Sequence, residues 1–305
     1  MITKKAKKIF FGNYKGGVGK TTSTYNIAVE LAKEKFNKGV LVIDLDPQSS
    51  LSGICMTAYG KEFGVKFDLA SLSKNETLNY IYTTYMQATK IGNINFSYST
   101  NQEMAYKVVK RLESKKIHFI PNNLFSEFGG LDRISINIKE NVSDLLILRN
   151  FIEDSGINNT FDFIFFDCPP SNNIITQSAF LYSDYYIIPT IMDSLSINGV
   201  SHYVSVIKNI YENHCVNGEA ANVLALLFGN EPKLIGTFET MRKGNLDTST
   251  HRNSLIKKGY YVFENRIHHR KDVADKISEG HEAGNDEYPL LTEEFVWRIE
   301  QMENR

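Results

Sequence analysis

Residues 13–22 read Asn13-Tyr14-Lys15-Gly16-Gly17-Val18-Gly19-Lys20-Thr21-Thr22. The apolar run before them predicts a strand from Lys8 to Phe11, and the apolar spacing after them predicts a helix from Thr21 to about Phe36. Glycines at a strand-to-helix turn let the backbone curl, so that successive N–H groups and the positive end of the helix face one anion. The stretch therefore predicts a loop that binds phosphate groups through Gly16, Gly17, Val18, Gly19, Lys20, Thr21 and Thr22.

Two side chains of this loop carry specific expectations. Lys20 follows the last glycine, where its ammonium group can reach the β- and γ-phosphates of a nucleotide. The hydroxyl group of Thr21 is placed to bind Mg²⁺ beside those phosphates. We therefore expect a nucleotide with Mg²⁺ as the ligand of this loop.

The composition of the chain limits what it can be. Its 305 residues are 42% hydrophobic, which suffices for a large core, and we expect one elaborated domain over residues 1–305. The formal net charge is −1, so any attraction to nucleic acid has to come from a local patch. Cys55, Cys168 and Cys215 form neither a disulfide framework nor a metal motif, which suits a reducing cytosol. No apolar run approaches the ~20 residues of a membrane span.

A second strand is expected to end in two carboxylates. Val40-Leu41-Val42-Ile43 follows a helix end at Lys38-Gly39 and is typical of a strand buried on both faces. The side chains of Asp44 and Asp46, two positions apart on an extended backbone, point the same way and emerge beside the phosphate loop. This placement favours Mg²⁺ chemistry, although an ordinary Asp-Pro turn would explain Asp46-Pro47 taken alone.

A third strand is expected to end in another acid. The apolar residues 163–166 run directly into Asp167, and Cys168-Pro169-Pro170 follows. An acid at the carboxyl end of a buried strand can contact the Mg²⁺ shell, and the two prolines stiffen a loop that senses the γ-phosphate. Cys168 fits a small buried apolar side chain better than a reactive thiol.

Taken together, these motifs resemble the ParA/MinD family of P-loop ATPases. Residues 15–22 match its deviant Walker A box, although Tyr14 stands where the general P-loop pattern has its first glycine. The resemblance implies that Lys15 reaches across an ATP-bound dimer to the partner's phosphates and that Asp46 positions or activates the attacking water. It also implies that Asp44 holds a magnesium-bound water and that Asp167 contacts the Mg²⁺ shell. The implied fold is α/β and P-loop NTPase-like: a mostly parallel twisted sheet with helices on both faces.

Elsewhere the pattern is less regular, and residues of about 55–150 are expected to form a partly helical elaboration. We expect helices at Tyr80–Thr89, Glu103–Leu112, Val142–Phe151 and Ser196–Tyr211. We expect strands at Ile117–Pro121, Tyr185–Thr190 and Val223–Phe228. By the resemblance, Asn230 after the last of these strands is a candidate adenine contact, and a plain Gly-Asn turn is the alternative. The apolar stripe of a closing helix, Thr292–Met302, is expected to dock on the body of the protein.

The last part of the chain consists of a basic stretch followed by an acidic one. Residues 230–276 hold ten Lys and Arg against six acids, and residues 277–305 hold eight acids against two Arg. Residues 230–276 therefore predict a basic face that meets phosphates, with a solvated helix surface as the alternative. The candidate DNA-binding residues are Arg242, Lys243, Arg252, Arg266, Arg270 and Lys271.

By this resemblance we expect a Mg²⁺-dependent ATPase of plasmid or chromosome partition. It would form a homodimer with ATP, bind DNA non-specifically and be released when a centromere-binding, ParB-like partner stimulates hydrolysis. We expect it in the cytoplasm, associated with the nucleoid and without a membrane partner. The alternatives are a MinD-like membrane-associated positioning ATPase, an electron-transfer ATPase like the nitrogenase iron protein, and a nucleotide-gated scaffold with negligible turnover. The acidic closing helix and the isolated cysteines weigh against the first two.

Overall fold

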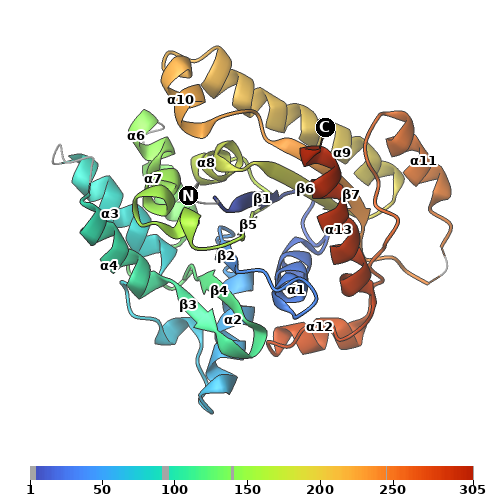
Figure 1. Ribbon diagram of the computed structural model, residues 1–305, viewed down its shortest axis with the longest axis horizontal. Coiled ribbons are helices and arrows are strands. Elements are labelled where there is room, and N and C mark those ends of the chain that lie inside the picture. The colour runs from blue at the N-terminus through green and yellow to red at the C-terminus, as the bar shows by residue number, and fades with distance from the viewer. Residues whose placement is uncertain (1–4, 91–95, 139–140, 245, 305) are drawn as a thin grey trace.

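A seven-stranded sheet forms the centre of the protein (Figure 1). The computed structural model describes residues 5–90, 96–138, 141–244 and 246–304. The strand order is β3-β4-β2-β5-β1-β6-β7, and every neighbouring pair is parallel except β3 with β4. The strands are β1 Lys7–Phe11, β2 Val40–Asp44, β3 Lys110–Leu112, β4 Ile117–Ile120, β5 Phe163–Asp167, β6 Tyr185–Thr190 and β7 Lys233–Glu239.

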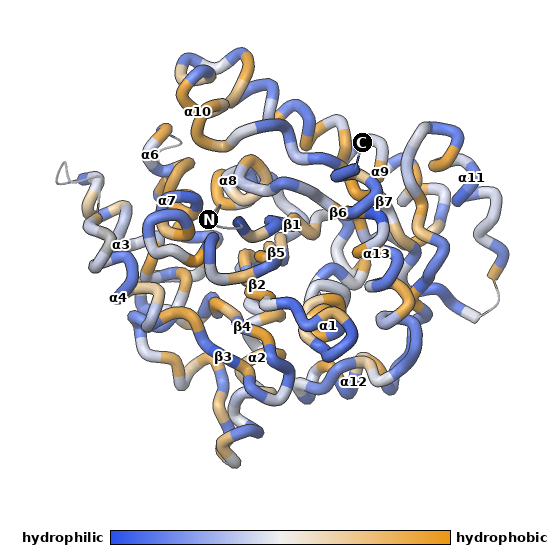
Figure 2. Tube along the Cα trace, viewed as in Figure 1, coloured by the Kyte–Doolittle hydropathy of each residue, from blue (hydrophilic) through white to orange (hydrophobic). Residues whose placement is uncertain are grey.

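Helices cover both faces of this sheet, which confirms the expected fold class. One face packs against α1 Lys20–Ala32, α2 Ser50–Glu62, α12 Lys271–Ser278 and α13 Glu287–Glu303. The other face packs against α3 Leu78–Lys90, α4 Tyr98–Val108, α5 Leu131–Asn137, α6 Val142–Leu145, α7 Ile147–Asp154, α8 Ile174–Tyr182, α9 Ser194–Tyr211, α10 Ala221–Phe228 and α11 Ser249–Lys257. Figure 2 shows hydrophobic stretches on the helices beside the sheet, such as α1 and α8.

The central strands are buried along their whole length because helices lie on both sides. All five residues of β2 and all five of β5 are buried, as their continuous apolar sequences predict. In the parallel register Asp44 pairs with Asp167, and Phe11 pairs with Asp167 from the other side. The ends of β1, β2 and β5 therefore meet at one edge of the sheet, which we call the carboxyl edge.

The predicted strand at Val223–Phe228 is wrong, because these residues form α10. A short apolar run does not distinguish a strand from a helix, and this one is rich in the helix formers Ala and Leu. The seventh strand is β7, whose pairing with β6 contains a register shift between Tyr186 and Ile187. That irregularity and Gly236 inside the strand weaken its pattern in the sequence.

Three other boundaries differ from the expectation. Helix α1 ends at Ala32 and not near Phe36, because Lys33 adopts an extended backbone. Helix α4 ends at Val108, and residues 110–112 turn back to form β3 beside β4. The helix expected over 142–151 divides at Leu146 into α6 and α7.

The closing helix α13 packs on the body of the protein, as its apolar stripe predicts. Phe295 is buried, and its ring lies 6.0 Å from that of Phe165 in β5. Tyr288 of the same helix lies with its hydroxyl 3.3 Å from that of Ser23 in α1. Among the described residues, no helix combines the length and the apolar character needed to cross a bilayer.

Candidate nucleotide-binding site

The loop between β1 and α1 has the shape of a phosphate cradle. Gly17 and Gly19 have φ values of 70° and 74°, in the left-handed region that glycine adopts without strain. A Cβ atom added at Gly16 or Gly17 would meet no atom within 4 Å, so the loop faces open space there. The loop is held from behind by Thr240, whose Oγ1 donates to the Val18 carbonyl oxygen at 2.8 Å. The predicted cradle between strand and helix is therefore present.

Lys20 lies buried at the base of the cradle, with 7% of its surface exposed. Its Nζ donates to the Lys15 carbonyl oxygen at a long 3.4 Å. Burial lowers the pKa of Lys20, and the charges of Asp167 and Asp46 partly oppose this effect. An ammonium group so poorly hydrogen-bonded and so desolvated gains from a phosphate beside it, which is the chemistry expected of this lysine.

Asp167 has a carboxylate oxygen that the protein does not satisfy. Its Oδ1 accepts a hydrogen bond from Thr24 at 3.3 Å, whereas Oδ2 is buried and bonds to no group among the described residues. Burial raises the pKa of Asp167, and the Thr21 hydroxyl group lowers it in part. A buried unpaired carboxylate oxygen beside a threonine hydroxyl suits a divalent cation with oxygen ligands, so these residues fit Mg²⁺.

Asp44 differs from Asp167, its register partner in the sheet, because both of its carboxylate oxygens accept hydrogen bonds. Its Oδ2 accepts hydrogen bonds from the backbone N and the Oγ of Ser52, at 2.7 and 2.6 Å. Its Oδ1 accepts a hydrogen bond from the backbone N of Asp46 at 3.1 Å. Burial raises the pKa of Asp44, and the nearby charge of Asp167 raises it further. With both oxygens already bonded, Asp44 is better placed to hold a metal-bound water than to bind the metal directly.

Asp46 lies half-buried just after β2 and faces the same edge. Its Oδ1 accepts a hydrogen bond from the backbone N of Gln48 at 2.9 Å. Its negative charge acts on the pKa values of both Lys20 and Asp167, which means that it lies close to each. Lys20, Asp46 and Asp167, which are far apart in the sequence, therefore come together at the carboxyl edge.

Lys15 contacts its own chain. Its Nζ lies 2.9 Å from Asp193 Oδ2 and 2.9 Å from Ser196 Oγ, at the start of α9. Its backbone N donates to Asn13 Oδ1 at 2.9 Å, which fixes the start of the loop. The aromatic ring of Tyr14, which replaces the first glycine of the general motif, packs edge-on against Tyr203 with ring centroids 4.8 Å apart.

A small pocket beside the cradle was not predicted from the sequence. It has a volume of about 60 Å³ and joins the start of α1 to the segments that follow β7. Met241 in its wall has a φ of 53°, which is unusual for a residue other than glycine. The residues lining it include Gly19, Thr22, Thr240, Met241, Ile267 and His268.

Asn230 does not belong to this site, and its predicted adenine contact is wrong. The prediction depended on a strand at residues 223–228, which are helical. Asn230 instead precedes β7 and lines a cavity with Asp184 and Lys233, at the start of β6 and β7. That is the amino edge of the sheet, and the cradle lies at the opposite edge.

The predicted DNA-binding cations differ in their exposure. Arg252 is 5% exposed, donates to the Phe263 carbonyl oxygen at 2.7 Å and lies 3.8 Å from the buried Glu239. Its assignment to a DNA surface is therefore wrong, because its guanidinium group is buried and contacts acceptors inside the protein. Arg266 also contacts Glu239, at 3.6 Å, and Arg242 donates to the Leu246 carbonyl oxygen at 3.0 Å. The exposed members of the predicted set are Lys243, Arg270 and Lys271.

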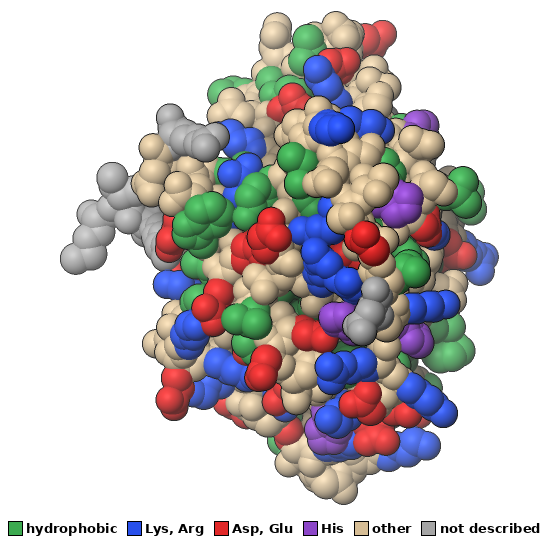
Figure 3. Space-filling model, turned by 90° about the vertical axis from the view of Figure 1, so that its right-hand side faces the viewer, with side chains coloured by type: hydrophobic (Ala, Val, Ile, Leu, Met, Phe, Trp, Pro, Cys, Tyr) green, Lys and Arg blue, Asp and Glu red, His purple; other side chains and the backbone are tan. Residues whose placement is uncertain are grey.

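Acidic side chains share the face on which these cations lie. Figure 3 shows Lys, Arg and His side chains interleaved with Asp and Glu on the side of the molecule that carries α11. Arg270 lies 3.5 Å from Glu287, and His268 Nδ1 lies 2.9 Å from the same carboxylate. The net positive count over residues 230–276 thus corresponds to a mixed surface.

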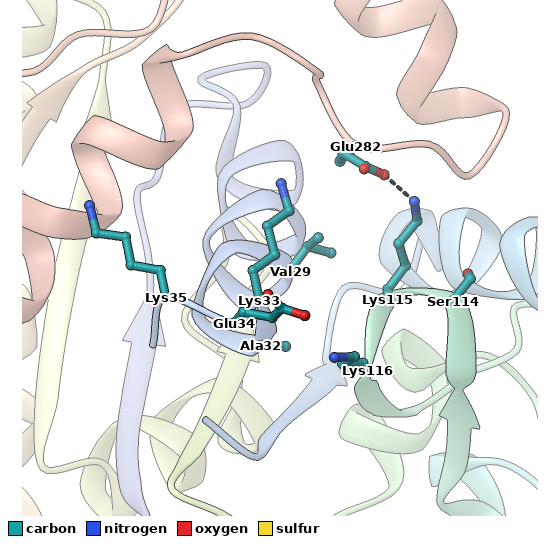
Figure 4. A pocket seen from close by; sticks show the side chains of 9 residues that line it. All are labelled: Val29, Ala32, Lys33, Glu34, Lys35, Ser114, Lys115, Lys116 and Glu282. Atoms are coloured by element: carbon teal, nitrogen blue, oxygen red, sulfur yellow. Dashed lines mark hydrogen bonds and ion pairs between the residues drawn. The ribbon is translucent and has the colours of Figure 1, made fainter. Parts of the chain in front are cut away.

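Another cavity, of about 380 Å³, lies at the end of α1 away from the cradle. Four lysines line it, and Figure 4 shows Lys115 and Glu282 pointing toward one another across its rim. Lys33 pairs with Glu30 at 2.6 Å and Lys35 pairs with Glu293. Because three of the four ammonium groups are paired with carboxylates, this cavity differs in character from the cradle.

Solved structures share this fold over nearly the whole chain. A plasmid partition protein of Borrelia burgdorferi bound to AMPPNP superposes with a TM-score of 0.63 at 19% identity, over 98% of this chain and 100% of that one. Cobyrinic acid a,c-diamide synthase of Mycobacterium smegmatis, solved with an ATP analogue and magnesium, gives a TM-score of 0.63 at 18% identity, over 97% of each chain. At these identities the likeness concerns the fold alone.

Proteins that are similar in sequence identify the family of this chain. The virulence plasmid ParA family protein pGP5-D of Chlamydia psittaci is 28% identical over 207 residues, which are 67% of this chain and 65% of that protein. The sporulation initiation inhibitor protein Soj of Bacillus subtilis is 24% identical over 208 residues, 68% of this chain and 67% of Soj. The chain thus spans less than two thirds of the chlamydial protein. The AAA domain family matches residues 6–219, more than half of the chain. With the cradle and the carboxylates described above, the chain belongs to the ParA/MinD family of P-loop ATPases.

Proposed function

We propose that this chain is a Mg²⁺-dependent ATPase of the ParA type that acts in DNA partition. Two chains would form a homodimer around two ATP molecules, and the dimer would bind DNA without sequence preference. A centromere-binding, ParB-like partner would stimulate hydrolysis and so release the dimer from the nucleoid. Relatives named as ParA family and sporulation proteins, and the shared fold of a plasmid partition protein, support this proposal.

One observation carries the catalytic part of the proposal. The buried Lys20 ammonium group and the unpartnered Asp167 carboxylate oxygen lie at the same edge as the open glycine loop. Lys20 would bind the phosphates, and Thr21 with Asp167 would hold Mg²⁺. Asp46 would orient a water molecule toward the γ-phosphate. Bound Mg²⁺ would neutralise charge that develops on the phosphoryl group.

We propose that the adenine base lies against the mouth of the small pocket beside Thr22, which at about 60 Å³ is too small to enclose the whole nucleoside. The pocket adjoins the cradle directly, because Gly19 and Thr22 belong to both. Its wall carries the apolar side chains of Met241 and Ile267, which suit a flat aromatic base. In this proposal the small pocket, and not Asn230, supplies the adenine contact that was predicted from the sequence.

For DNA, the proposal depends on the exposed cations near β7 and α12. Lys243, Arg270 and Lys271 are exposed, with Arg270 also 3.5 Å from Glu287, whereas Arg252 is buried in the core. Contacts with the phosphate backbone give affinity without sequence preference and make binding depend on salt.

The decisive experiment measures phosphate release from Mg·ATP and DNA binding with ATP, with ADP and without nucleotide. We expect turnover that rises when DNA and partner are added, and DNA binding that requires ATP. Lys20→Ala should abolish both, and the control Lys35→Ala, in the turn that follows α1, should leave both unchanged. ATP-dependent DNA binding without phosphate release would identify a nucleotide-gated scaffold and contradict the proposed hydrolysis.

A further inference from the structure

The loop that carries Asp46 is held by one buried side chain from the neighbouring strand. Asn122 follows β4 and has no exposed surface. Its Nδ2 donates to the carbonyl oxygens of Asp44 and Asp46, at 3.2 and 2.6 Å. One planar amide group thus grips the backbone on either side of the Leu45-Asp46 segment. Rotation of that segment would leave the N–H donors of the fully buried Asn122 amide without acceptors, which is costly.

The remaining polar atoms of Asn122 are bonded as well. Its backbone N donates to Ser52 Oγ at 2.9 Å, and the same hydroxyl group donates to the Asp44 carboxylate. Its Oδ1 accepts a hydrogen bond from Ser49, which lies at the start of α2 with a φ of 54°. The bond from Ser49 orients the Asn122 amide, so that among the residues the structure describes its N–H donors bond only to the Asp46 loop.

Hydrogen bonds therefore hold both the backbone N and the carbonyl oxygen of Asp46. Its backbone N donates to Asp44 Oδ1, and its carbonyl oxygen accepts from Asn122. With the backbone fixed, the hydrogen bond from the Gln48 backbone N to Asp46 Oδ1, at 2.9 Å, orients the side chain. The charge of this carboxylate acts on Lys20 and Asp167. A carboxylate that has to orient water needs this kind of support, since small displacements of a catalytic group reduce the rate strongly.

The helical region after α2 supports Asn122 in turn. The backbone N of Leu78, the first residue of α3, donates to the Pro121 carbonyl oxygen at 2.8 Å. Asn79, which is also fully buried, accepts a hydrogen bond from the backbone N of Asn123 at 2.9 Å and donates to the Asn123 carbonyl oxygen at 3.2 Å. The start of α3 thus clamps the residues on either side of Asn122.

We propose that Asn122 is a positioning residue for the proposed hydrolysis: it fixes the backbone of Asp46 and is itself held by the start of α3. This inference deepens the proposed function and rests on it for the effect on turnover. In this proposal, the region between α2 and β5 keeps the end of β4 in register with the Asp44–Asp46 loop.

The test compares Asn122→Ala with Asn123→Ala. Asn123 is the matched control: it is adjacent and buried, and its side chain bonds to Leu69 and Phe125 instead of the Asp46 loop. We expect Asn122→Ala to lower kcat by about 10- to 100-fold while the Kd for Mg·ATP stays within about threefold. We also expect faster amide hydrogen exchange at residues 45–49 in this variant, with unchanged exchange at residues 14–20. Asn123→Ala should change neither kcat nor exchange at residues 45–49.

Two outcomes would overturn the inference: an unchanged exchange rate at residues 45–49 in Asn122→Ala, or an equal loss of kcat in both variants. Should Asn122→Ala not fold, Asn122→Leu keeps about the same volume without a buried charge and removes the two N–H donors, and the same results are expected. A wild-type protein without turnover would contradict the proposed hydrolysis, and the exchange measurement would still decide the role of Asn122.

Discussion

Replacement of Asp167 by asparagine should make the nucleotide-free protein more stable and less responsive to Mg·ATP. The carboxylate of Asp167 is fully buried, its Oδ2 has no partner among the described residues, and the negative charge of Asp46 acts on it. Each of these features disfavours the charged form, so the pKa of Asp167 is raised in the folded state. The asparagine side chain would keep the shape of the aspartate and remove its charge.

The size of the effect follows from the pKa. A group whose pKa is higher in the folded than in the unfolded state binds more protons when folded, so its contribution to stability falls as the pH rises from about 4 through the folded pKa. A difference of one pKa unit corresponds to about 1.4 kcal/mol, and burial of an unpaired carboxylate costs several kcal/mol. We therefore expect Asp167→Asn to gain about 2 to 4 kcal/mol at pH 8 and nearly nothing below pH 4. At pH 8 this corresponds to a rise in Tm of roughly 5 °C or more.

The assay is unfolding by urea and by heat at pH 4, 6 and 8, with and without Mg·ATP. A ligand at 100 times its Kd stabilises the folded state by about 2.7 kcal/mol, and we expect the Mg²⁺-dependent part of this gain to vanish in Asp167→Asn. Asp184→Asn is the control, because Asp184 pairs with Lys8 at the amino edge and is 43% exposed. It should show neither the gain at pH 8 nor the loss of the Mg²⁺ response.

The reasoning is refuted if Asp167→Asn is no more stable than the wild type at pH 8 in the absence of nucleotide. An undiminished Mg²⁺ response in the variant would likewise remove Asp167 from the metal site. A gain that is the same at pH 4 and pH 8 would show that the charge of the carboxylate is not its cause.

Three further predictions concern other parts of the chain. Asp46→Ala should keep ATP-dependent dimerisation, measured by sedimentation, and lose turnover, because the water loses its orienting group; normal phosphate release would refute this. Arg252→Ala should lower the free energy of unfolding by about 3 kcal/mol in urea titrations, because it removes one of the two cations beside the buried Glu239 and the hydrogen bond to the Phe263 carbonyl oxygen; a loss below about 1 kcal/mol would contradict this buried role. Replacement of the exposed cations by glutamine should weaken DNA binding and reduce its salt dependence by about one charge for each lost contact, whereas an unaltered salt slope would move the DNA surface elsewhere. These cations are Lys243, Arg270 and Lys271.

The sequence was informative wherever local chemistry dictates the structure. The glycines of the cradle require positive φ values, and the continuous apolar runs of β2 and β5 require burial on both faces. Acids that directly follow such strands have to emerge at the carboxyl edge, and Asp44 and Asp167 do so as register partners. The fold class and the core of the site could be predicted for these reasons.

Features that depend on which elements become neighbours could not be predicted. The burial of Arg252 results from its contacts with Glu239 and the Phe263 carbonyl oxygen, and nothing in a count of charges along the chain reveals them. Asn122 gains its importance only because β4 lies next to β2 in the sheet. The run at residues 223–228 is compatible with a strand or a helix by its apolar character alone, and it forms α10.

The ion pair between Lys15 and Asp193 holds the lysine side chain only weakly. Its ammonium group and the Asp193 carboxylate are each about two fifths exposed, so water and dissolved ions compete directly for both. Pairs of this kind contribute only ~0 to 1 kcal/mol, and salt weakens them further. A phosphate group presented from outside would therefore meet a lysine that is already oriented by the loop and that leaves its intrachain partner at almost no energetic penalty.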